Sequence, residues 1–204
     1  MNGMDLKATY NKIAKDWFND HKESDWWNES ADKFLGLLKP GGKVLDVGCG
    51  AGLKTKYLLD RGFEAVGIDF SEEMIKLAKV YCPQAQFFVE DIKQPLGPAM
   101  FDGIFAQAVL LHIPKAEVAK VLQNFYEHLN QPGYLYVVVK ELRPGAKDEQ
   151  NVVESDYDYE YERFFSFFTM PELEGYFKQV GLEVVHKAVV TRADTNWLVI
   201  IGKK

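Results

Sequence analysis

The chain has 204 residues, of which 47% are hydrophobic and 26% charged, and its formal net charge is −6. These fractions exclude a disordered or fibrous chain, and the length suits one substantial domain. The acidic balance argues against a protein that wraps nucleic acid nonspecifically, because neutralising phosphates needs clustered lysine and arginine. A small neutral or cationic substrate fits this balance better.

The two cysteines and the chain start bear on the compartment. Cys49 and Cys82 lack metal-ligand spacing, and a disulfide at Cys49 would distort the glycine-rich turn around it. The N-terminus has no basic start followed by an apolar core, and no apolar run approaches membrane-spanning length. We therefore expect a cytoplasmic monomer or homodimer with no metal, membrane or nucleic-acid partner.

The first half of the chain predicts a helical start and a ligand-binding turn. Residues 1–40 carry apolar side chains at helical spacing and end at a Pro-Gly-Gly sequence, which predicts a helical cap. A buried strand over residues 44–47 then stops in glycines at alternate positions, Gly48, Gly50 and Gly52. Such glycines let the backbone turn sharply and approach a ligand closely. The pattern predicts a nucleotide-type turn.

The rest of the chain alternates between strands and helices. Ser71 and Thr169 are expected helix N-caps, with Glu172 completing a capping box after Thr169. The last two strands leave no room for a crossover helix between them and must be antiparallel. The fold class is therefore α/β, a doubly wound, mostly parallel seven-stranded sheet with a C-terminal antiparallel hairpin. The further strands are expected over residues 65–69, 86–89, 101–106, 134–139, 182–191 and 196–201.

The glycine turn resembles the first motif of the class I S-adenosylmethionine-dependent methyltransferases. In that family a strand ends in an acid and is followed by glycines at alternate positions, as in Asp46-Val47-Gly48-Cys49-Gly50-Ala51-Gly52. An NAD-binding turn keeps two residues between its second and third glycines. Here only Ala51 lies between Gly50 and Gly52, which favours the methyltransferase family. The resemblance implies a Rossmann-like methyltransferase fold with cofactor contacts at Asp46, Gly48, Cys49, Gly50 and Gly52.

Other contacts are implied at the ends of the second and third strands. Asp69 would accept hydrogen bonds from both ribose hydroxyls of an adenosyl group, the alternative being a carboxylate that caps the next helix. Phe70 and Met74 would flank the adenine, and core packing is the alternative for Met74. Asp91 would receive the adenine amino group and Ile92 would hold the ring edge. The alternative for Asp91 is an acid solvated in a loop.

The resemblance also points to residues nearer the reacting methyl group. The backbone just after the fourth strand, around Gln107, would face the methionine part of the cofactor. Tyr10 would lie on a helix that closes over the cofactor. His112 is the candidate general base, because it lies at the carboxyl edge of the sheet and imidazole titrates near neutral pH. Its alternative role is a histidine bonded to a loop carbonyl.

An aromatic and acidic insertion over residues 141–168 is a candidate wall of a substrate pocket. Tyr157, Tyr159 and Tyr161 alternate with acids, so that an extended segment would have aromatics on one face, and a solvated edge strand would give the same pattern. With the cap over residues 1–40, this insertion decorates a single domain over residues 1–204.

The function implied by the resemblance is transfer of a methyl group from S-adenosylmethionine to a small molecule by in-line displacement, leaving S-adenosylhomocysteine. Methylation of a protein or RNA and noncatalytic binding of the cofactor stay open as alternatives. The sequence does not choose oxygen, nitrogen, sulfur or carbon as the acceptor atom.

Overall fold

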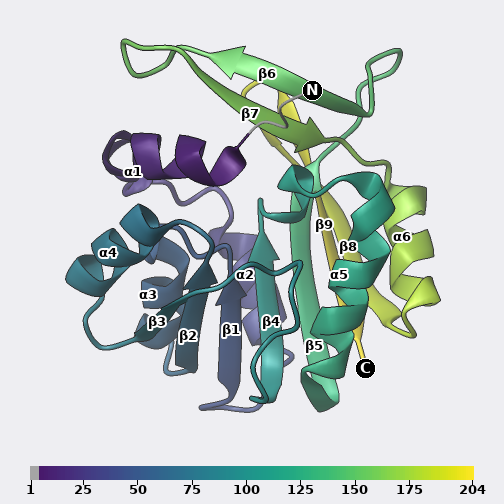
Figure 1. Ribbon diagram of the computed structural model, residues 1–204. Helices are drawn as coiled ribbons and strands as arrows, with labels where there is room; N and C mark the ends of the chain where they lie inside the picture. Colours follow the sequence, from purple (N-terminus) through teal and green to yellow (C-terminus); the bar gives the residue numbers. More distant parts are fainter. Residues whose placement is uncertain (1–4) are drawn as a thin grey trace.

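A seven-stranded mixed sheet forms the centre of the computed structural model, which describes residues 5–204 (Figure 1). Its strand order is β3-β2-β1-β4-β5-β9-β8. The first five strands in this order pair in parallel, whereas β9 pairs antiparallel with both β5 and β8. The expected fold class is confirmed. The strands are β1 (Lys43–Val47), β2 (Glu64–Asp69), β3 (Gln86–Val89), β4 (Phe101–Gln107), β5 (Leu129–Lys140), β8 (Glu183–Arg192) and β9 (Thr195–Lys203).

The order of the strands reverses between β1 and β4. From β1 the chain runs outward to β2 and β3, then returns to place β4 on the other side of β1. At such a reversal the loops after neighbouring strands diverge, and a crevice opens at the carboxyl ends of the strands. The glycine turn follows β1, so the topology places it at this crevice.

Helices cover both faces of the sheet and bury its core. On one face, α5 (Lys115–Glu127) and α6 (Met170–Gln179) pack on alternate residues of β4 and β5. On the other face, α2 (Asn28–Leu35) buries Phe34 against Phe105 and Tyr136, whose rings stack with centroids 4.4 Å apart. The flanking helices α3 (Leu53–Asp60) and α4 (Glu72–Tyr81) follow β1 and β2. The N-caps expected at Ser71 and Thr169 are confirmed, including the capping box at Thr169.

A roof of two elements lies over the carboxyl ends of the strands (Figure 1). It consists of α1 (Leu6–His21) and a separate hairpin of β6 (Glu149–Glu154) and β7 (Tyr161–Ser166). The two elements are bonded to each other: the Thr9 hydroxyl donates to the Glu162 carbonyl at 3.0 Å, and Lys12 Nζ donates to the Glu160 carbonyl at 3.1 Å. The roof therefore covers the crevice from above.

The tyrosine-rich segment differs from the extended strand considered for it. Only Tyr161 lies in β7, whereas Tyr157 and Tyr159 belong to the turn of the hairpin, where Asp158 has a φ of 63°. The three rings still gather, with Tyr157 stacked on Tyr161 at 5.4 Å, and the Tyr159 hydroxyl donates to Asp16 on α1 at 2.7 Å. Residues 157–160 are not extended, so the alternation considered for them does not set the faces of their side chains, and the turn brings the rings together instead.

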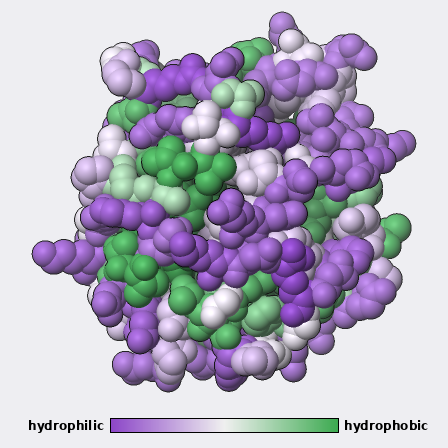
Figure 2. Space-filling model, turned by 180° about the vertical axis from the view of Figure 1, so that it is seen from behind, coloured by the Kyte–Doolittle hydropathy of each residue, from purple (hydrophilic) through white to green (hydrophobic). Residues whose placement is uncertain are grey.

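The back of the molecule is mostly hydrophilic, with separate hydrophobic patches (Figure 2). The outermost strand, β8, leaves Val185 and Val189 exposed. No helix within residues 5–204 combines the length and the apolar character needed to cross a membrane.

Candidate functional site

The turn after β1 needs glycine at its alternate positions. Gly48, Gly50 and Gly52 have φ values of 63°, 53° and 81°, in the left-handed region that residues with a Cβ rarely adopt. A Cβ at Gly48 would lie 2.5 Å from Cγ2 of Val109, and one at Gly50 would lie 3.3 Å from Cζ3 of Trp17. Backbone conformation and close packing therefore both keep this turn open.

Asp46 anchors the turn from below. Its side chain is buried at the end of β1, where Oδ2 accepts a hydrogen bond of 2.6 Å from the Thr55 hydroxyl on α3. Burial is the main reason why its pKa rises to about 7, and the bond from Thr55 opposes that rise. Asp46 thus fixes the start of α3 relative to the sheet.

Asp69 connects the glycine turn to the next helix. From the end of β2, its Oδ2 accepts the Gly50 amide at 2.9 Å and its Oδ1 accepts the Ser71 amide at 2.8 Å. The Ser71 hydroxyl in turn caps α4 by accepting the Met74 amide. Burial raises the pKa of Asp69 to about 6, against the effect of the two amides. The carboxylate therefore braces the turn and also borders the adjoining pocket.

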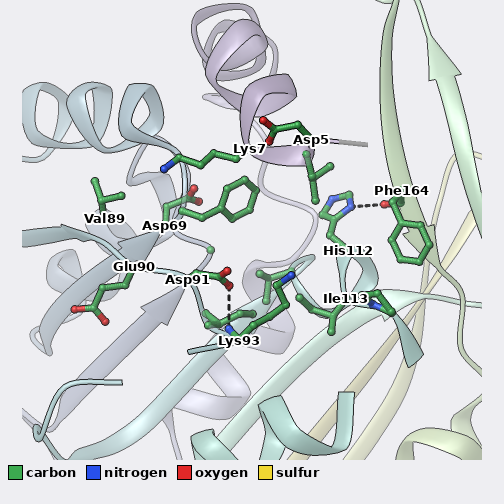
Figure 3. A pocket seen from close by; sticks show the side chains of 16 residues that line it. Asp5, Lys7, Asp69, Val89, Glu90, Asp91, Lys93, His112, Ile113 and Phe164 are labelled. Carbon is green, nitrogen blue, oxygen red and sulfur yellow. Dashed lines mark hydrogen bonds between the residues drawn. The ribbon is translucent and has the colours of Figure 1, made fainter. Parts of the chain in front are cut away.

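That pocket has a volume of about 550 Å³ and opens beneath α1. Figure 3 shows Asp69 and Asp91 on one side and His112 on the other. The expected site residues that line it come from the turn after β1, the ends of β2 and β3, and the segment after β4: Gly48, Asp69, Phe70, Asp91, Ile92 and His112. Sequence reasoning missed Lys7, Lys93, Val109 and Phe164 among the lining residues. Val109 lies two residues beyond the end of β4, so the rule that ligands bind at carboxyl ends was the signal for it.

Other expected site residues lie behind the pocket wall. Met74 is 1% exposed and packs against Ala14 and Ala51, so core packing, its alternative role, is the arrangement seen. Cys49 is buried in a further cluster, and burial raises the pKa of its thiol. Gln107 is 6% exposed, and its Oε1 accepts no hydrogen bond from residues 5–204. Asp46, Gly50 and Gly52 belong to the turn and its anchor.

His112 lies in the short 3-10 helix η1 (Leu110–His112) with both ring nitrogens bonded. Nδ1 is 2.7 Å from the Phe164 carbonyl, which can only accept, so Nδ1 carries the proton. Nε2 then accepts from the Tyr10 hydroxyl, also at 2.7 Å. Burial is the main reason why the pKa of His112 falls to about 3, and the imidazole is neutral. The carbonyl contact considered from the sequence is therefore present within the pocket.

A polar cluster extends from His112 across the roof. Arg163 on β7 donates to the Tyr10 hydroxyl at 3.3 Å and forms a bidentate ion pair with Glu154 on β6. We call Tyr10, His112, Arg163 and Glu154 the Tyr10 cluster. It joins α1, η1, β6 and β7 above the crevice. Sequence reasoning missed Arg163 and Glu154, although Arg163 is the only cation among the aromatic and acidic residues 154–168.

The chain is similar in sequence to known methyltransferases. A family model described as a methyltransferase domain matches residues 20–187. An uncharacterized methyltransferase of Synechocystis sp. is 33% identical over 110 residues, or 52% of this chain and 50% of that protein. A ubiquinone biosynthesis O-methyltransferase of Azoarcus sp. is 30% identical over 199 residues, which cover 89% of this chain and 75% of the relative.

A solved structure shares the fold over nearly the whole chain. The 1,6-didemethyltoxoflavin-N1-methyltransferase of Burkholderia thailandensis, crystallised with 1,6-didemethyltoxoflavin and S-adenosylhomocysteine, is 22% identical and has a TM-score of 0.72. The match covers 97% of this chain and 88% of that one. Three observations agree on the family of this chain: the order of the strands, the glycine turn where that order reverses, and the family model that matches most of the chain. The chain belongs to the methyltransferase domain family and is a class I S-adenosylmethionine-dependent methyltransferase.

Proposed function

We propose that the protein binds S-adenosylmethionine in the pocket beneath α1 and transfers its methyl group to a small molecule. The observation that carries the proposal is the meeting of the glycine turn, Asp69 and Asp91 around one cavity at the reversal of the strand order. The bound cofactor supplies an activated methyl group on a sulfonium. The protein's part is then to align the acceptor with that group and to exclude water.

The adenosine half fits the side of the pocket formed by β2 and β3. Asp69 would accept both ribose hydroxyls on lone pairs that the two amides leave free. Asp91 Oδ1 accepts the Lys93 amide at 2.9 Å, and Oδ2 accepts nothing from residues 5–204, so it can take the adenine amino group. Phe70 and Ile92 supply apolar surface for the ring.

The methionine half fits the glycine turn and the end of β4. The unpartnered Oε1 of Gln107 is a buried acceptor, and an ammonium group is a donor that would satisfy it. Tyr10 and Trp17 of α1 lie over this region, Trp17 against Gly50 and Tyr10 against His112. In the closed arrangement these rings would keep water from the reacting atoms.

A small-molecule acceptor is supported by the names of the relatives, which include a ubiquinone biosynthesis O-methyltransferase and a 1,6-didemethyltoxoflavin-N1-methyltransferase. We further propose that residues 1–204 act as one domain, with residues 1–40 as cofactor cap and residues 141–168 as the substrate-side insertion. Calorimetry with S-adenosylmethionine, S-adenosylhomocysteine and NAD, followed by turnover of labelled cofactor on small phenols, amines, thiols and carboxylates, tests the proposal. Tight NAD binding without binding of S-adenosylmethionine would contradict it, and binding without turnover on small acceptors would favour a macromolecular acceptor or a noncatalytic role.

Cofactor affinity is expected to fall in acid because Asp69 must be ionised to accept both ribose hydroxyls. Burial raises its pKa to about 6 in the free protein, so the carboxylate takes up a proton as the pH falls below that value. Affinity for S-adenosylhomocysteine should then fall by up to about tenfold per pH unit below pH 6 and stay level above pH 7. Calorimetry across this range measures the profile.

The Asp69→Asn variant is the control for this profile. It cannot ionise, so its weaker binding should not vary with pH between about pH 5 and about pH 8. His112 contributes no titration there, because its pKa of about 3 keeps it neutral throughout. A dependence that persists unchanged in Asp69→Asn would assign the titration to Asp46, whose pKa is about 7, and contradict the prediction.

The contacts of His112 support a positioning role more than the general-base role suggested by the sequence, because both nitrogens are bonded and the pKa is low. In His112→Asn the amide can still donate to the Phe164 carbonyl, but Tyr10 loses its acceptor. We expect kcat to fall by less than about tenfold with an unchanged pH profile of kcat, whereas loss of a general base lowers it by about 100-fold or more.

His128→Asn is the matched control, because within residues 5–204 the side chain of His128 bonds only the Asn124 carbonyl, at the end of α5. Its steady-state parameters should equal those of the parent protein. If His112→Asn lost about 100-fold in kcat together with the basic limb of the profile, His112 would be the base and the positioning role would be wrong.

A further inference from the structure

A second cavity, of about 490 Å³, lies between the β6–β7 hairpin and the carboxyl end of β5. Phe165 of β7 lines this cavity, whereas the preceding residue, Phe164, lines the pocket in Figure 3. Its lining combines two phenylalanines with charged groups and side chains from the β8–β9 turn, including Lys140, Arg143, Glu154, Phe165, Phe167 and Asn196. Both hydrophobic surface and charge are therefore available to a ligand.

Two cations line this cavity: Lys140, the last residue of β5, is partly buried, whereas Arg143 is exposed and donates to the Asp194 backbone carbonyl. Lys140 Nζ lies 4.2 Å from the centroid of the Phe165 ring and 5.8 Å from that of Trp197. Within residues 5–204, no oxygen forms a hydrogen bond or ion pair with Nζ. A desolvated ammonium that has only aromatic faces as neighbours is destabilised relative to one paired with an anion.

Of the three carboxylates that line the cavity, two are bonded to other residues and the third is exposed. Glu154 holds Arg163 through both of its oxygens. Glu141 accepts from the Asn196 amide at 2.8 Å, and Asp194 is exposed at the turn between β8 and β9. None of these carboxylates lies within 4.0 Å of Lys140 Nζ. Within residues 5–204, neither Lys140 nor Arg143 forms an ion pair, and Lys140 is the partly buried cation that the cavity offers to a ligand.

The surrounding charges also favour an anion. Burial lowers the pKa of Lys140, and the nearby Arg163 and Arg143 lower it further. Glu154 raises this pKa, but its effect is smaller than that of Arg163. The lysine thus stands in a net positive field. A bound carboxylate would relieve this field and restore the charged form of the lysine.

The cavity also adjoins the expected position of the methyl donor. Gln107 at the end of β4 pairs in register with Val138 of β5, and Lys140 follows two residues later. Because side chains alternate along a strand, Lys140 lies on the same face of the sheet as Gln107 and one step nearer the carboxyl edge. Phe165 bridges the two spaces, since its ring contacts Lys140 on one side and lies 4.9 Å from the His112 ring on the other.

We propose that this cavity holds the methyl acceptor and that Lys140 binds a carboxylate carried by a planar, aromatic acceptor. The rings of Phe165 and Phe167 stack with centroids 6.0 Å apart and an interplanar angle of 27°, which presents flat apolar surface beside the ammonium. The inference rests on the proposed function, because the acceptor is placed relative to a bound methyl donor. It reverses the preference for a neutral or cationic substrate that the net charge of −6 suggested, since local charge outweighs the total.

Charge-matched ligands test the proposal on the full chain saturated with S-adenosylhomocysteine. Calorimetry compares 4-hydroxybenzoate with 4-hydroxybenzamide, which keeps the ring and the shape but removes the charge. We expect the carboxylate to bind at least about tenfold more tightly, as one charge-assisted hydrogen bond implies. Lys140→Met should abolish this preference, and Lys140→Arg should keep it, because guanidinium also binds carboxylate. Lys147→Met makes the same change at an exposed lysine outside the cavity and should match the parent protein.

Each outcome decides the matter. Equal affinity for the two ligands, binding of neither, or a preference that survives in Lys140→Met would overturn the proposal. If the protein bound the carboxylate through Lys140 but did not bind S-adenosylhomocysteine, the anion site would be supported and the proposed function would be refuted. Loss of binding in both Lys140→Met and Lys140→Arg would assign Lys140 a role other than charge recognition, such as accepting a proton, and would also count against the proposal.

Discussion

Replacing Asp69 with alanine is expected to weaken binding of S-adenosylhomocysteine by about 100-fold or more. Each hydrogen bond to an ionised carboxylate contributes about 1.5–3 kcal/mol, and two ribose hydroxyls would lose their acceptor. The substitution also removes the acceptor for the amides of Gly50 and Ser71, so the glycine turn and the start of α4 lose their common brace. Calorimetry at neutral pH measures the affinity, and thermal unfolding reports whether the variant is folded.

The control for Asp69→Ala is Asp60→Ala on α3. Asp60 is exposed and bonds only Lys56 on the same helix, so affinity should not change. Asp69→Ala that unfolds cooperatively and binds the ligand within about threefold of the parent protein would show that the carboxylate does not contact the cofactor. The ribose assignment, and the placement of the cofactor that depends on it, would then be wrong.

Gly48→Ala is expected to remove cofactor binding and to destabilise the fold. The new Cβ would lie 2.5 Å from Cγ2 and 2.9 Å from Cβ of Val109, and the φ of 63° disfavours any residue with a Cβ. Overpacking of this kind destabilises by about 1–3 kcal/mol, and a left-handed alanine adds about 1 kcal/mol. Denaturant unfolding measures the loss of stability, and calorimetry measures the loss of affinity.

A second substitution separates the two causes. In Gly48→Ala/Val109→Ala the Cγ atoms of Val109 are gone, so most of the overpacking should be relieved while the backbone strain remains. We expect the double variant to recover about 1 kcal/mol or more relative to Gly48→Ala, which is a favourable coupling between the two positions. If the double variant lost as much free energy of unfolding as the two single variants together, Gly48 and Val109 would not be in the contact that the structure shows.

The central sheet was predictable from sequence because each strand is short, apolar and bounded by a turn. The strand expected over residues 86–89 coincides with β3, and the antiparallel end of the sheet followed from the short connection between β8 and β9. The signals that identify these strands are local: short apolar runs and the turn residues that bound them. Asp69 and Asp91 were identified as pocket residues for the same reason, since Asp69 ends β2 and Asp91 lies two residues beyond β3.

The roof was not predictable in the same way. Tyr10 and His112 are 102 residues apart, and their hydrogen bond depends on how α1 docks against β7, which no local pattern records. β6 is short and mostly exposed, and β7 mixes aromatic with charged residues, so neither strand has the uninterrupted apolar run that marks a buried strand. Lys140 comes directly after the strand expected over residues 134–139, and no sequence pattern singles it out. Its lack of a counter-ion becomes visible only once the surrounding side chains are in place.

The hydrogen bonds that tie α1 to the hairpin have a kinetic consequence. Thr9 and Lys12 bond backbone carbonyls of the hairpin, while Tyr10 bonds both His112 and Arg163. Ligand entry beneath α1 and release from it therefore require several of these bonds to open together. We expect a cooperative opening of this kind to slow the departure of S-adenosylhomocysteine, so that the rate at which α1 lifts from the hairpin, more than the displacement reaction, would set turnover.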